Sequence, residues 1–480
     1  MAIATGIAKK VSVKKEAVYG VAPVKGTGTG YTTSALGFAS GTTVIPLITG
    51  TGTVLAGDTV QVAGDTNFYL VTVGISAPGS ITIAGTGLKV AVPASATAVT
   101  ITSGAQAYRR VTSNLALAKQ TYTSAEIRPD YQVADFRHGV RSITGAINGE
   151  LSPGTHSLVL AAALRAAYVA GVSATGASIT IAGTGPSYTV TRAAGSYLAD
   201  GFKIGDVIRL SVGTFSAANI NTNLFILGLT ATVATVLVLT GVALVPEGPI
   251  ATSTVSVVGK KAMVPLSGHT NDSFAVEHWH SDIGQSEMFR GCRVSQLDIG
   301  LPPTGMATLN TAFMGIDITT AQTQQLTVPN TATTSGVLAS VNGVISVGGL
   351  QIALLTGLTM KINPNMTQLP VVGSNVFPDT FAGRVMITGQ MTALFSDATL
   401  RDYFVNETEV SIACAFTTGN TATADVMSFI LPRVKCGGSA KDDGEKGLVQ
   451  TIPFQALLNV NGGAGVASDN TTMSVQDSLA

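Results

Sequence analysis

Residues 139–152 read GVRSITGAINGELS, and residues 383–396 read GRVMITGQMTALFS. The two stretches share Ile-Thr-Gly and a final Ser at one offset, because 387 − 143 and 396 − 152 both equal 244. In each stretch apolar residues alternate with small or polar ones, which is the pattern of a half-buried β-strand. The repeat therefore predicts two copies of one folding unit in a single chain.

A helix is expected after each copy of this strand. Ser152 is a favoured N-cap, Pro153 suits the first helical position, and the Ala- and Leu-rich residues 158–170 end at Gly171. Ser396 is the N-cap of the second copy. Further strands are predicted after the helices, at 274–280, 292–301 and 307–316 in the first copy and at 410–417, 426–434 and 447–458 in the second.

Three segments rich in Val, Ile, Thr and Gly interrupt this pattern, at 37–104, 172–259 and 321–360. In the first two, a Gly-Asp pair leads a strand, at 57–58 and at 205–206. A Thr-Asn sequence and an apolar run follow in both, at 66–71 and at 222–227. These shared features predict that one small β-domain has been inserted twice.

The composition favours a β-protein that assembles with copies of itself. Charged residues make up 11% of the 480, the 27 Lys and Arg cancel the 27 Asp and Glu, and 54 residues are Gly. So few charges do little to keep copies apart, so we expect much of the surface to be buried between subunits. A net charge of zero disfavours a general nucleic-acid binder, which needs an excess of Lys and Arg.

The sequence favours neither secretion nor insertion in a membrane. The Lys-rich N-terminus is not followed by an apolar run and a cleavage site, so we expect no signal peptide. Three cysteines far apart fit neither a disulfide framework nor a metal knuckle, which favours a reducing compartment. Residues 224–245 are mostly apolar, but their Thr and Gly content and lack of flanking Lys or Arg predict strands instead of a membrane span.

The densest set of potential metal ligands is Glu277, His278, His280 and Asp282. On a strand, the last three of these residues lie on one face, which is compatible with zinc. The interpretation we favour is a polar row at a subunit interface or facing a channel, with His278 and His280 as contact residues. We therefore expect no metal and no cofactor.

No motif predicts catalysis, because no sequence places a nucleophile, a base and an orienting group together. Near the C-terminus, Asp442, Asp443 and Glu445 lie between Lys441 and Lys446. Their spacing does not match known calcium loops, so they predict an exposed turn between strands. The chain is expected to be a structural protein and not an enzyme.

The most charged run of the first copy precedes its repeat strand. Two interpretations remain open for this run, namely ion pairs across a subunit interface and a solvated loop. Its residues are Glu126, Arg128, Asp130, Asp135, Arg137 and Arg141.

Three stretches together resemble the major tail tube proteins of long-tailed bacteriophages, the siphophages. They are residues 126–150 (EIRPDYQVADFRHGVRSITGAINGE), 276–313 and 381–405. The resemblance covers about 105–171 and 262–458 and leaves out the inserted segments. It implies a β-sandwich with one flanking helix, whose strands join those of neighbouring subunits in a barrel around a central channel for DNA. It also implies that the charged run includes a loop that contacts neighbouring subunits.

The resemblance further implies six tube domains in each ring. Two copies per chain then predict a trimeric, pseudo-hexameric ring, with a hexamer as the alternative. Partners would be further copies and other tail proteins, such as the tape measure and the tail terminator, while DNA would pass without specific binding. The expected location is the virion tail, assembled in the bacterial cytoplasm. The alternatives are another phage structural protein, either a capsid decoration protein or a tail terminator, and, from a different class, a surface adhesin.

The expected fold is therefore mainly β, with two tandem tail-tube β-sandwich domains, each with one flanking helix, and two inserted small β-domains. The expected division is an N-terminal arm with the first strands of tube domain 1 at 1–36, inserted domains at 37–104 and 172–261, the rest of tube domain 1 at 105–171 and 262–320, a linker at 321–349, tube domain 2 at 350–465 and a tail at 466–480.

Overall fold

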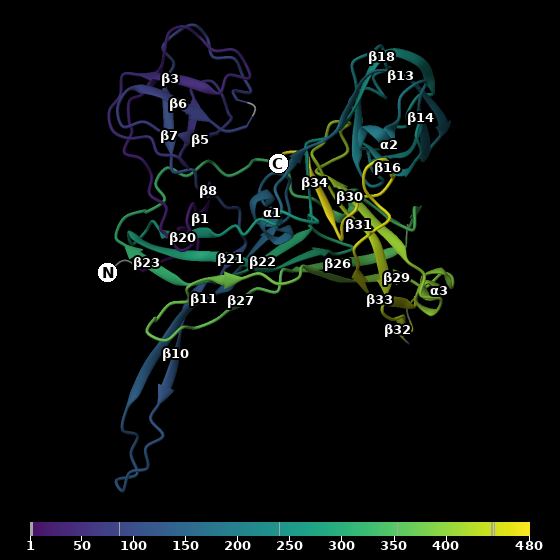
Figure 1. Cartoon of the computed structure of the whole chain (residues 1–480). Coiled ribbons are helices and arrows are strands. Elements are labelled where there is room, and N and C mark those ends of the chain that lie inside the picture. Colours follow the sequence, from purple (N-terminus) through teal and green to yellow (C-terminus); the bar gives the residue numbers. More distant parts are fainter. Residues whose placement is uncertain (1–2, 86, 240, 353, 443–444, 446) are drawn as a thin grey trace.

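The structure is a computed structural model and describes residues 3–85, 87–239, 241–352, 354–442, 445 and 447–480. It is mainly β, as predicted. Two small β-domains lie on one side of a large sheet, and a long hairpin projects on the other side (Figure 1).

The large sheet contains two units with the same strand order. The first unit has the order β1 (Lys9–Lys15), β20 (Phe274–His280), β21 (Gln285–Leu301), β22 (Thr308–Gly315), β11 (Phe136–Glu150) and β10 (Ala116–Thr123). The second has β24 (Gly343–Val347), β30 (Val410–Thr417), β31 (Val426–Cys436), β33 (Val449–Ala456), β29 (Met386–Leu394) and β26 (Leu355–Asn363). The order of these strands along the chain is also the same in both units. The Ile-Thr-Gly repeat therefore marks a repeat of the whole unit.

Short strands extend both units. They are β8 (Gln106–Ala107), β9 (Thr112–Ser113), β12 (Val169–Ala170), β19 (Lys260–Met263), β23 (Asp317–Ala321), β25 (Leu350–Gln351), β32 (Ala440–Lys441) and β34 (Ser474–Asp477). A separate pair, β27 (Thr367–Gln368) and β28 (Thr380–Phe381), lies in the long loop between β26 and β29, and a 3-10 turn spans Ser340–Asn342. The strands β20 and β30 have the predicted bounds.

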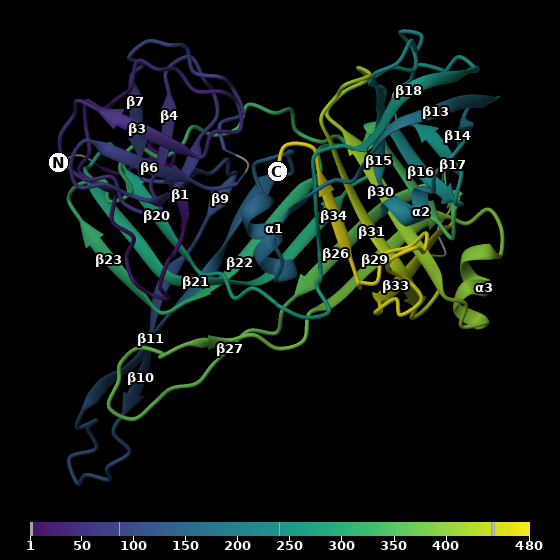
Figure 2. The ribbon, with the colours of Figure 1, turned by 45° about the horizontal axis from the view of Figure 1, so that its top comes forward.

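One helix follows the third strand of each unit, as predicted, but both helices are short. They are α1 (Ser157–Leu164), which packs against β21 and β26, and α3 (Thr399–Val405) (Figure 2). The prediction that the first helix begins at Pro153 and runs to 170 is wrong. Ser152 bonds the Thr155 hydroxyl instead of capping the helix, and Arg165 has a φ of 55°, a left-handed conformation that ends it.

Each unit is a two-layered sandwich. Alternate residues of β30 show the layering, because Ile412, Cys414 and Phe416 lie in the central core whereas Ala413 and Ala415 lie beneath the second inserted domain. The strands β11, β22, β29 and β33 close the other side of the core, with Ile143 and Ile387 as equivalent buried residues.

The inserted segments form two six-stranded domains. The first has the order β2 (Thr32–Thr33), β3 (Val44–Ile48), β6 (Gly79–Ile83), β5 (Tyr69–Val73), β4 (Thr59–Val62) and β7 (Val99–Thr102). Backbone hydrogen bonds from Thr33 to Thr97 and from Val99 to Tyr31 join its two edges, so we call it barrel 1. Barrel 2 is closed and has the order β13 (Ser173–Thr184), β14 (Ser187–Arg192), β17 (Val233–Val238), β16 (Leu224–Leu229), β15 (Val207–Ser211) and β18 (Glu247–Val257), with the short helix α2 (Tyr197–Asp200).

The two barrels follow one plan. Numbered along the chain, the strands of both have the order 1-2-5-4-3-6. The Gly-Asp pair makes the same turn before the third strand in each. The Asp58 carboxylate accepts the N–H of Leu55, and the Asp206 carboxylate accepts the N–H of Lys203, both at 2.9 Å. The sequence similarity at these turns therefore reflects a shared structure.

The strand pairings suggest other boundaries than those expected from the sequence. The strand β2 lies in barrel 1 although it precedes residue 37, β24 belongs to the second unit although it lies in the expected linker, and β34 is a buried strand within the expected tail. We propose that barrel 1 spans about 26–104 and that the second unit spans about 340–480. The apolar stretch 224–245 contains β16 (Leu224–Leu229) and β17 (Val233–Val238), and Thr240 lies outside the described residues. No helix of the described residues is long and apolar enough to cross a membrane.

A buried histidine predicts how stability depends on pH. His156 is 1% exposed and is held by the Tyr108 hydroxyl at 2.7 Å and the Glu150 carbonyl oxygen at 3.0 Å. Burial lowers the pKa of His156 to about 4. In the unfolded chain the pKa is about 6.5, so between these values only the unfolded chain binds the proton. The contribution is therefore complete above pH 6.5 and is lost as the pH falls towards 4.

We expect His156→Gln to flatten this pH dependence. The difference in unfolding free energy between the wild type and the variant should shrink by up to about 3 kcal/mol from pH 7 to pH 4. Urea unfolding at several pH values measures it, with exposed His269→Gln as the control. A variant whose pH dependence runs parallel to that of the wild type would contradict the assignment.

Candidate assembly surfaces

The two units are joined by pairing between β21 and β26. Buried side chains of β21 face buried side chains of β26 in the pairs Leu297–Ile362, Ile299–Met360 and Leu301–Leu358. Beyond Leu301, the residues Pro302 and Pro303 lie near β24 and β26, where they help to line a cavity of only about 110 Å³. We call this contact the in-chain joint.

The strand order identifies the counterparts of the in-chain joint. Leu117 of β10 faces Ile143, and Ile362 of β26 faces Ile387, which is the equivalent of Ile143 in the second unit. The strands β9 and β10 together therefore correspond to β26. On the other side of the joint, Ala440 of β32 faces Thr451, just as Asp298 of β21 faces Asn310. The strand β32 therefore corresponds to the part of β21 that contains Asp298. Within the described residues, no strand pairs with the outer edge of β9, β10 or β32. These two open edges are complementary in position to the two sides of the in-chain joint.

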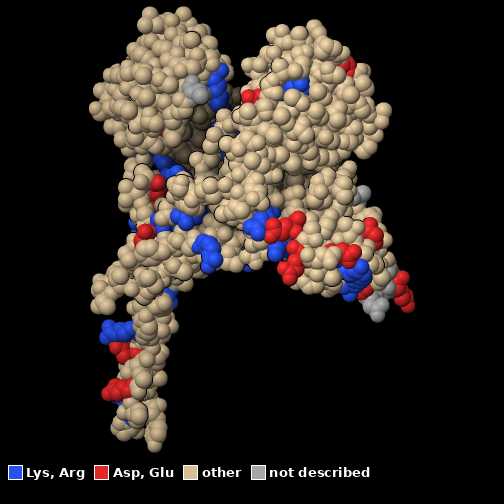
Figure 3. Space-filling view, turned by 45° about the vertical axis from the view of Figure 1, so that its right-hand side comes forward, with Lys and Arg blue, Asp and Glu red and all other residues tan. Residues whose placement is uncertain are grey.

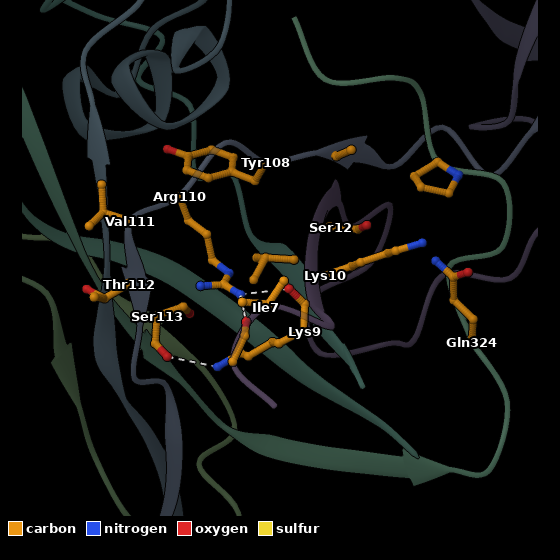
Figure 4. Close-up of a pocket in the computed structure, with 14 residues that line it drawn as sticks. Ile7, Lys9, Lys10, Ser12, Tyr108, Arg110, Val111, Thr112, Ser113 and Gln324 are labelled. Atoms are coloured by element: carbon orange, nitrogen blue, oxygen red, sulfur yellow. Dashed lines mark hydrogen bonds between the residues drawn. The ribbon is translucent and has the colours of Figure 1, made fainter. Parts of the chain in front are cut away.

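A cavity of about 810 Å³ lies between β1 and β9, and we call it the cationic pocket (Figure 4). Lys9, Lys10 and Arg110 line it, and no Asp or Glu is among the described residues of its lining. Lys9 Nζ donates to the Ser113 carbonyl oxygen at 2.8 Å, and Arg110 donates to the Lys9 and Gly6 carbonyl oxygens at 2.7 and 2.9 Å. Burial, together with Arg110, lowers the pKa of Lys9.

The face of the first unit that points away from the core is polar and carries few charges. On β21 and β22, the Gln296 amide donates to the Asp298 carboxylate at 2.8 Å, and the Asn310 amide approaches the same oxygen at 3.4 Å. The half-buried or exposed positions on β11, β29 and β33 continue this face with Ser142, Thr144, Asn148, Thr388, Gln390, Thr392, Thr451 and Gln455. Neutral polar groups thus dominate one side of the two-unit sheet.

The structure places the charged run on the projecting hairpin, which we call the arm (residues 118–142) (Figures 1 and 3). The charges at its tip pair locally, in Arg128–Asp130 at 2.8 Å and Arg137–Asp135 at 2.7 Å, with Glu126 4.0 Å from Arg128. Arg141 lies at the base of the arm and pairs with Asp317 at 3.0 Å.

The arm also exposes apolar side chains that the charge pattern did not reveal. Ile127 is 98% exposed and Tyr131 is 99% exposed, and Val133 and Phe136 are exposed as well. Apolar residues gathered at the end of a projecting hairpin are typical of a contact surface for another protein. The alternation of apolar and charged residues in 126–136 was the only signal in the sequence.

The predicted histidine row divides between the interior and the surface. His278 is 1% exposed, and its Nε2 lies 2.7 Å from the Ser113 hydroxyl, so we leave it out of the proposed interface. Burial lowers the pKa of His278 to about 3. His280 is partly exposed, with its Nε2 4.0 Å from Glu287. Glu277 is buried and accepts hydrogen bonds from Ser286, Gln325 and Leu326, whereas Asp282 binds Thr5. In the part of the chain that the structure describes, no three His, Cys, Asp or Glu side chains form a metal cluster.

The predicted acidic turn follows the open edge of β32. Asp442 and Glu445 are exposed, and the Asp442 carboxylate accepts the Val449 N–H at 2.6 Å. Asp443 and Lys446 lie outside the described residues. The turn therefore places carboxylates next to one of the two open edges.

Comparison with known families adds one match. A family model described as phage tail tube protein matches residues 6–456. No curated protein shows a significant match to the chain.

Proposed function

The chain belongs to the phage tail tube protein family, and we propose that it is the major tail tube subunit, whose rings stack into the conduit for DNA ejection. The observation that carries this proposal is the in-chain joint, together with two open edges that match its two sides. Family membership places the protein in the virion tail, and assembly in the host cytoplasm is part of the proposal. The proposal includes no cofactor and no catalytic step.

The proposed ring contains three chains. Each chain already makes one joint between two equivalent units, and head-to-tail pairing of β32 with β9 and β10 of the next chain repeats this joint. Three in-chain joints and three joints between chains then close a pseudo-hexameric ring. Closure pairs the open edges of β9, β10 and β32, which would otherwise invite uncontrolled association.

The polar face of the sheet is proposed to line the lumen. Where β21 pairs with β26, the charged side chains on this face have opposite signs, because Asp298 faces Lys361. A wall of neutral Ser, Thr, Asn and Gln side chains offers DNA phosphates few cations to bind, so the duplex can slide without being held. This supports passage without specific binding.

The barrels are proposed to decorate the outside of the tube. Barrel 2 packs on Ala413 and Ala415 of β30, on the opposite side of the sandwich from the polar face. Barrel 1 is held on the same side of the chain through Asn330, whose side chain accepts hydrogen bonds from Thr59 and Thr102 at 2.8 and 2.7 Å (Figure 1). Their surfaces carry few charges (Figure 3).

The arm is proposed to join successive rings. It continues β10 and β11 beyond the sheet (Figure 1), so in a closed barrel it crosses the edge of its own ring. The exposed Ile127 and Tyr131 would then be buried against the adjacent ring. Rings at the ends of the tube would contact other tail proteins, such as the tape measure and the tail terminator.

A pair of cysteines tests the number of chains in the ring. In the in-chain joint Asp298 faces Lys361, and their counterparts are Ala440 and Ala116. Residues directly opposite in antiparallel strands have Cα atoms about 4.5–5.5 Å apart, which a disulfide can bridge. We expect Ala116→Cys with Ala440→Cys, in a Cys436→Ser background, to give dimers and closed trimers on oxidation of assembled protein, with no larger product in denaturing gels.

The matched control is Asp298→Cys with Lys361→Cys, which should crosslink within one chain and add no mass. A ladder that continues to six chains would show a hexameric ring. Absence of links between chains, with intact crosslinking in the control, would contradict the proposed joint. Closed shells in electron micrographs would instead favour a capsid decoration protein.

A further inference from the structure

The two joints differ in what lies beyond the paired strands. In the in-chain joint, the chain continues from Leu301 into Pro302 and Pro303, beside Ile345, Leu355 and Leu358. Apart from Ser340, the side chains that line this space are apolar, and the joint closes over a cavity of only about 110 Å³. This joint therefore relies on the burial of apolar side chains.

The cationic pocket occupies the corresponding place in the first unit. Val11 of β1 faces His278, and Ile345 of β24 faces Cys414 in the same position of the second unit. Lys9 and Gly343 each lie two residues earlier on these strands and are therefore counterparts. On the other wall, Ser113 corresponds to Leu358, because Ser113 faces Ile147 and Leu358 faces the equivalent Met391. Arg110 and Leu355 each lie three residues before this pair. The pocket has about 810 Å³ of space where the in-chain joint has about 110 Å³.

The positive charge in the pocket is only partly offset within the described residues, where Glu287 favours the charged form of Lys9. Lys9, Lys10 and Arg110 form no ion pair with a carboxylate of the described residues, and the polar contacts of Lys9 and Arg110 are backbone carbonyl oxygens. Figure 4 shows the side chains of Lys9 and Arg110 directed into the same space. Cations crowded in this way favour an anionic occupant.

The residues that would reach this pocket are acidic. Because 440 − 298 and 441 − 299 both equal 142, Gly300 corresponds to Asp442, and the turn that contains Glu445 takes the place of the turn that contains Pro302 and Pro303. In the pairing that repeats the in-chain joint, Asp442 would face Asn114, next to the Ser113 carbonyl group that Lys9 binds. Both carboxylates are exposed in the single chain.

We propose that the cationic pocket of one chain receives the acidic turn, with Asp442 and Glu445, of a second copy of this chain. The inference rests on the proposed ring and specifies how its chains recognise one another. Beyond the paired strands, the joints of the ring then alternate between apolar surroundings within each chain and ionic ones between chains. Charge complementarity steers the correct ends together and disfavours a pocket meeting a second pocket.

Charge reversal on each side, followed by reversal on both, tests this recognition. We expect Lys10→Glu with Arg110→Glu, and separately Asp442→Lys with Glu445→Lys, to raise the concentration needed for assembly about tenfold or more at low salt. The variant with all four changes restores complementary charges at every joint and should assemble within about threefold of the wild type. Sedimentation and electron microscopy measure assembly, and circular dichroism checks that each variant is folded.

The single change Lys10→Glu has a matched control in Lys89→Glu, another exposed lysine, which lies in barrel 1. The control should assemble like the wild type. The inference would be overturned if folded variants with one side reversed assembled normally, or if the variant with all four changes did not regain assembly. The proposed ring would still be tested separately by the cysteine pair. A wild-type protein that never forms rings would instead sink the proposed function on which the inference rests.

Discussion

Replacing residues 124–135 by Asn-Gly should leave rings of three chains but abolish tubes. Thr123 and Phe136 face each other across β10 and β11, so the two new residues can close the hairpin as a tight turn. The arm tip makes its ion pairs within itself, so its removal leaves the core unaltered. Electron microscopy should then show single rings at concentrations at which the wild type forms tubes.

The size of this effect follows from the exposed apolar residues of the tip. Ile127 and Tyr131 have almost their whole surfaces in water in the single chain, and burial of such side chains in an interface often contributes about 2 kcal/mol or more each. Three arms act together in each ring, so their contributions combine in one stacking step. We expect the protein concentration at which tubes form to rise at least about 100-fold.

Point variants separate the stacking role of the arm from its charge. Ile127→Asp should reproduce most of the loss, whereas Leu36→Asp changes another highly exposed apolar residue, in barrel 1, and should have little effect. Charge reversal at Arg137 tests the sequence-based hypothesis directly, because this side chain is 79% exposed and, among the described residues, forms an ion pair only with Asp135. Normal tubes from the shortened-arm variant would show that rings stack through other surfaces.

The duplicated unit could be predicted from the sequence because its strands follow a strict local pattern. The Ile-Thr-Gly repeat marks strands with the same partners, since Gly145 faces Phe313 and Gly389 faces Phe454. The early end of α1 was not accessible, because nothing in the composition of 158–170 indicates that Arg165 adopts a positive φ. The surrounding sandwich decides where this helix stops.

The cationic pocket could not be predicted from the sequence, for a different reason. Lys9 and Lys10 are separated from Arg110 by the whole of barrel 1, and only the pairing of β1 with β8 brings the two segments together. A lysine run alone fits an exposed N-terminus equally well. The burial of His278 likewise depends on Ser113, which lies 165 residues away in the sequence.

Lys261→Ala should destabilise the contact between barrel 2 and the tube units by about 3–5 kcal/mol. The Lys261 ammonium lies 2.6 Å from the Asp206 carboxylate of barrel 2 and 2.7 Å from the Asp469 carboxylate near the C-terminus. Both carboxylates are almost fully buried, so removal of the lysine leaves two unpaired charges in a medium of low polarity. Hydrogen exchange of β15, β19 and β34 amides should accelerate at least about 100-fold, since 1.4 kcal/mol is tenfold.

Two further variants distinguish loss of charge balance from loss of packing. Lys260→Ala removes the neighbouring exposed lysine and should leave exchange unchanged. Lys261→Met combined with Asp206→Asn and Asp469→Asn removes all three charges and should recover most of the stability, because neutral groups of similar shape leave no buried charge uncompensated. Equal exchange in the Lys261 and Lys260 variants would show that the triad does not hold barrel 2. A tube that must keep its outer domains in fixed positions along many rings requires such a rigid attachment, and β19, which continues directly from barrel 2, pairs with β34 to provide it.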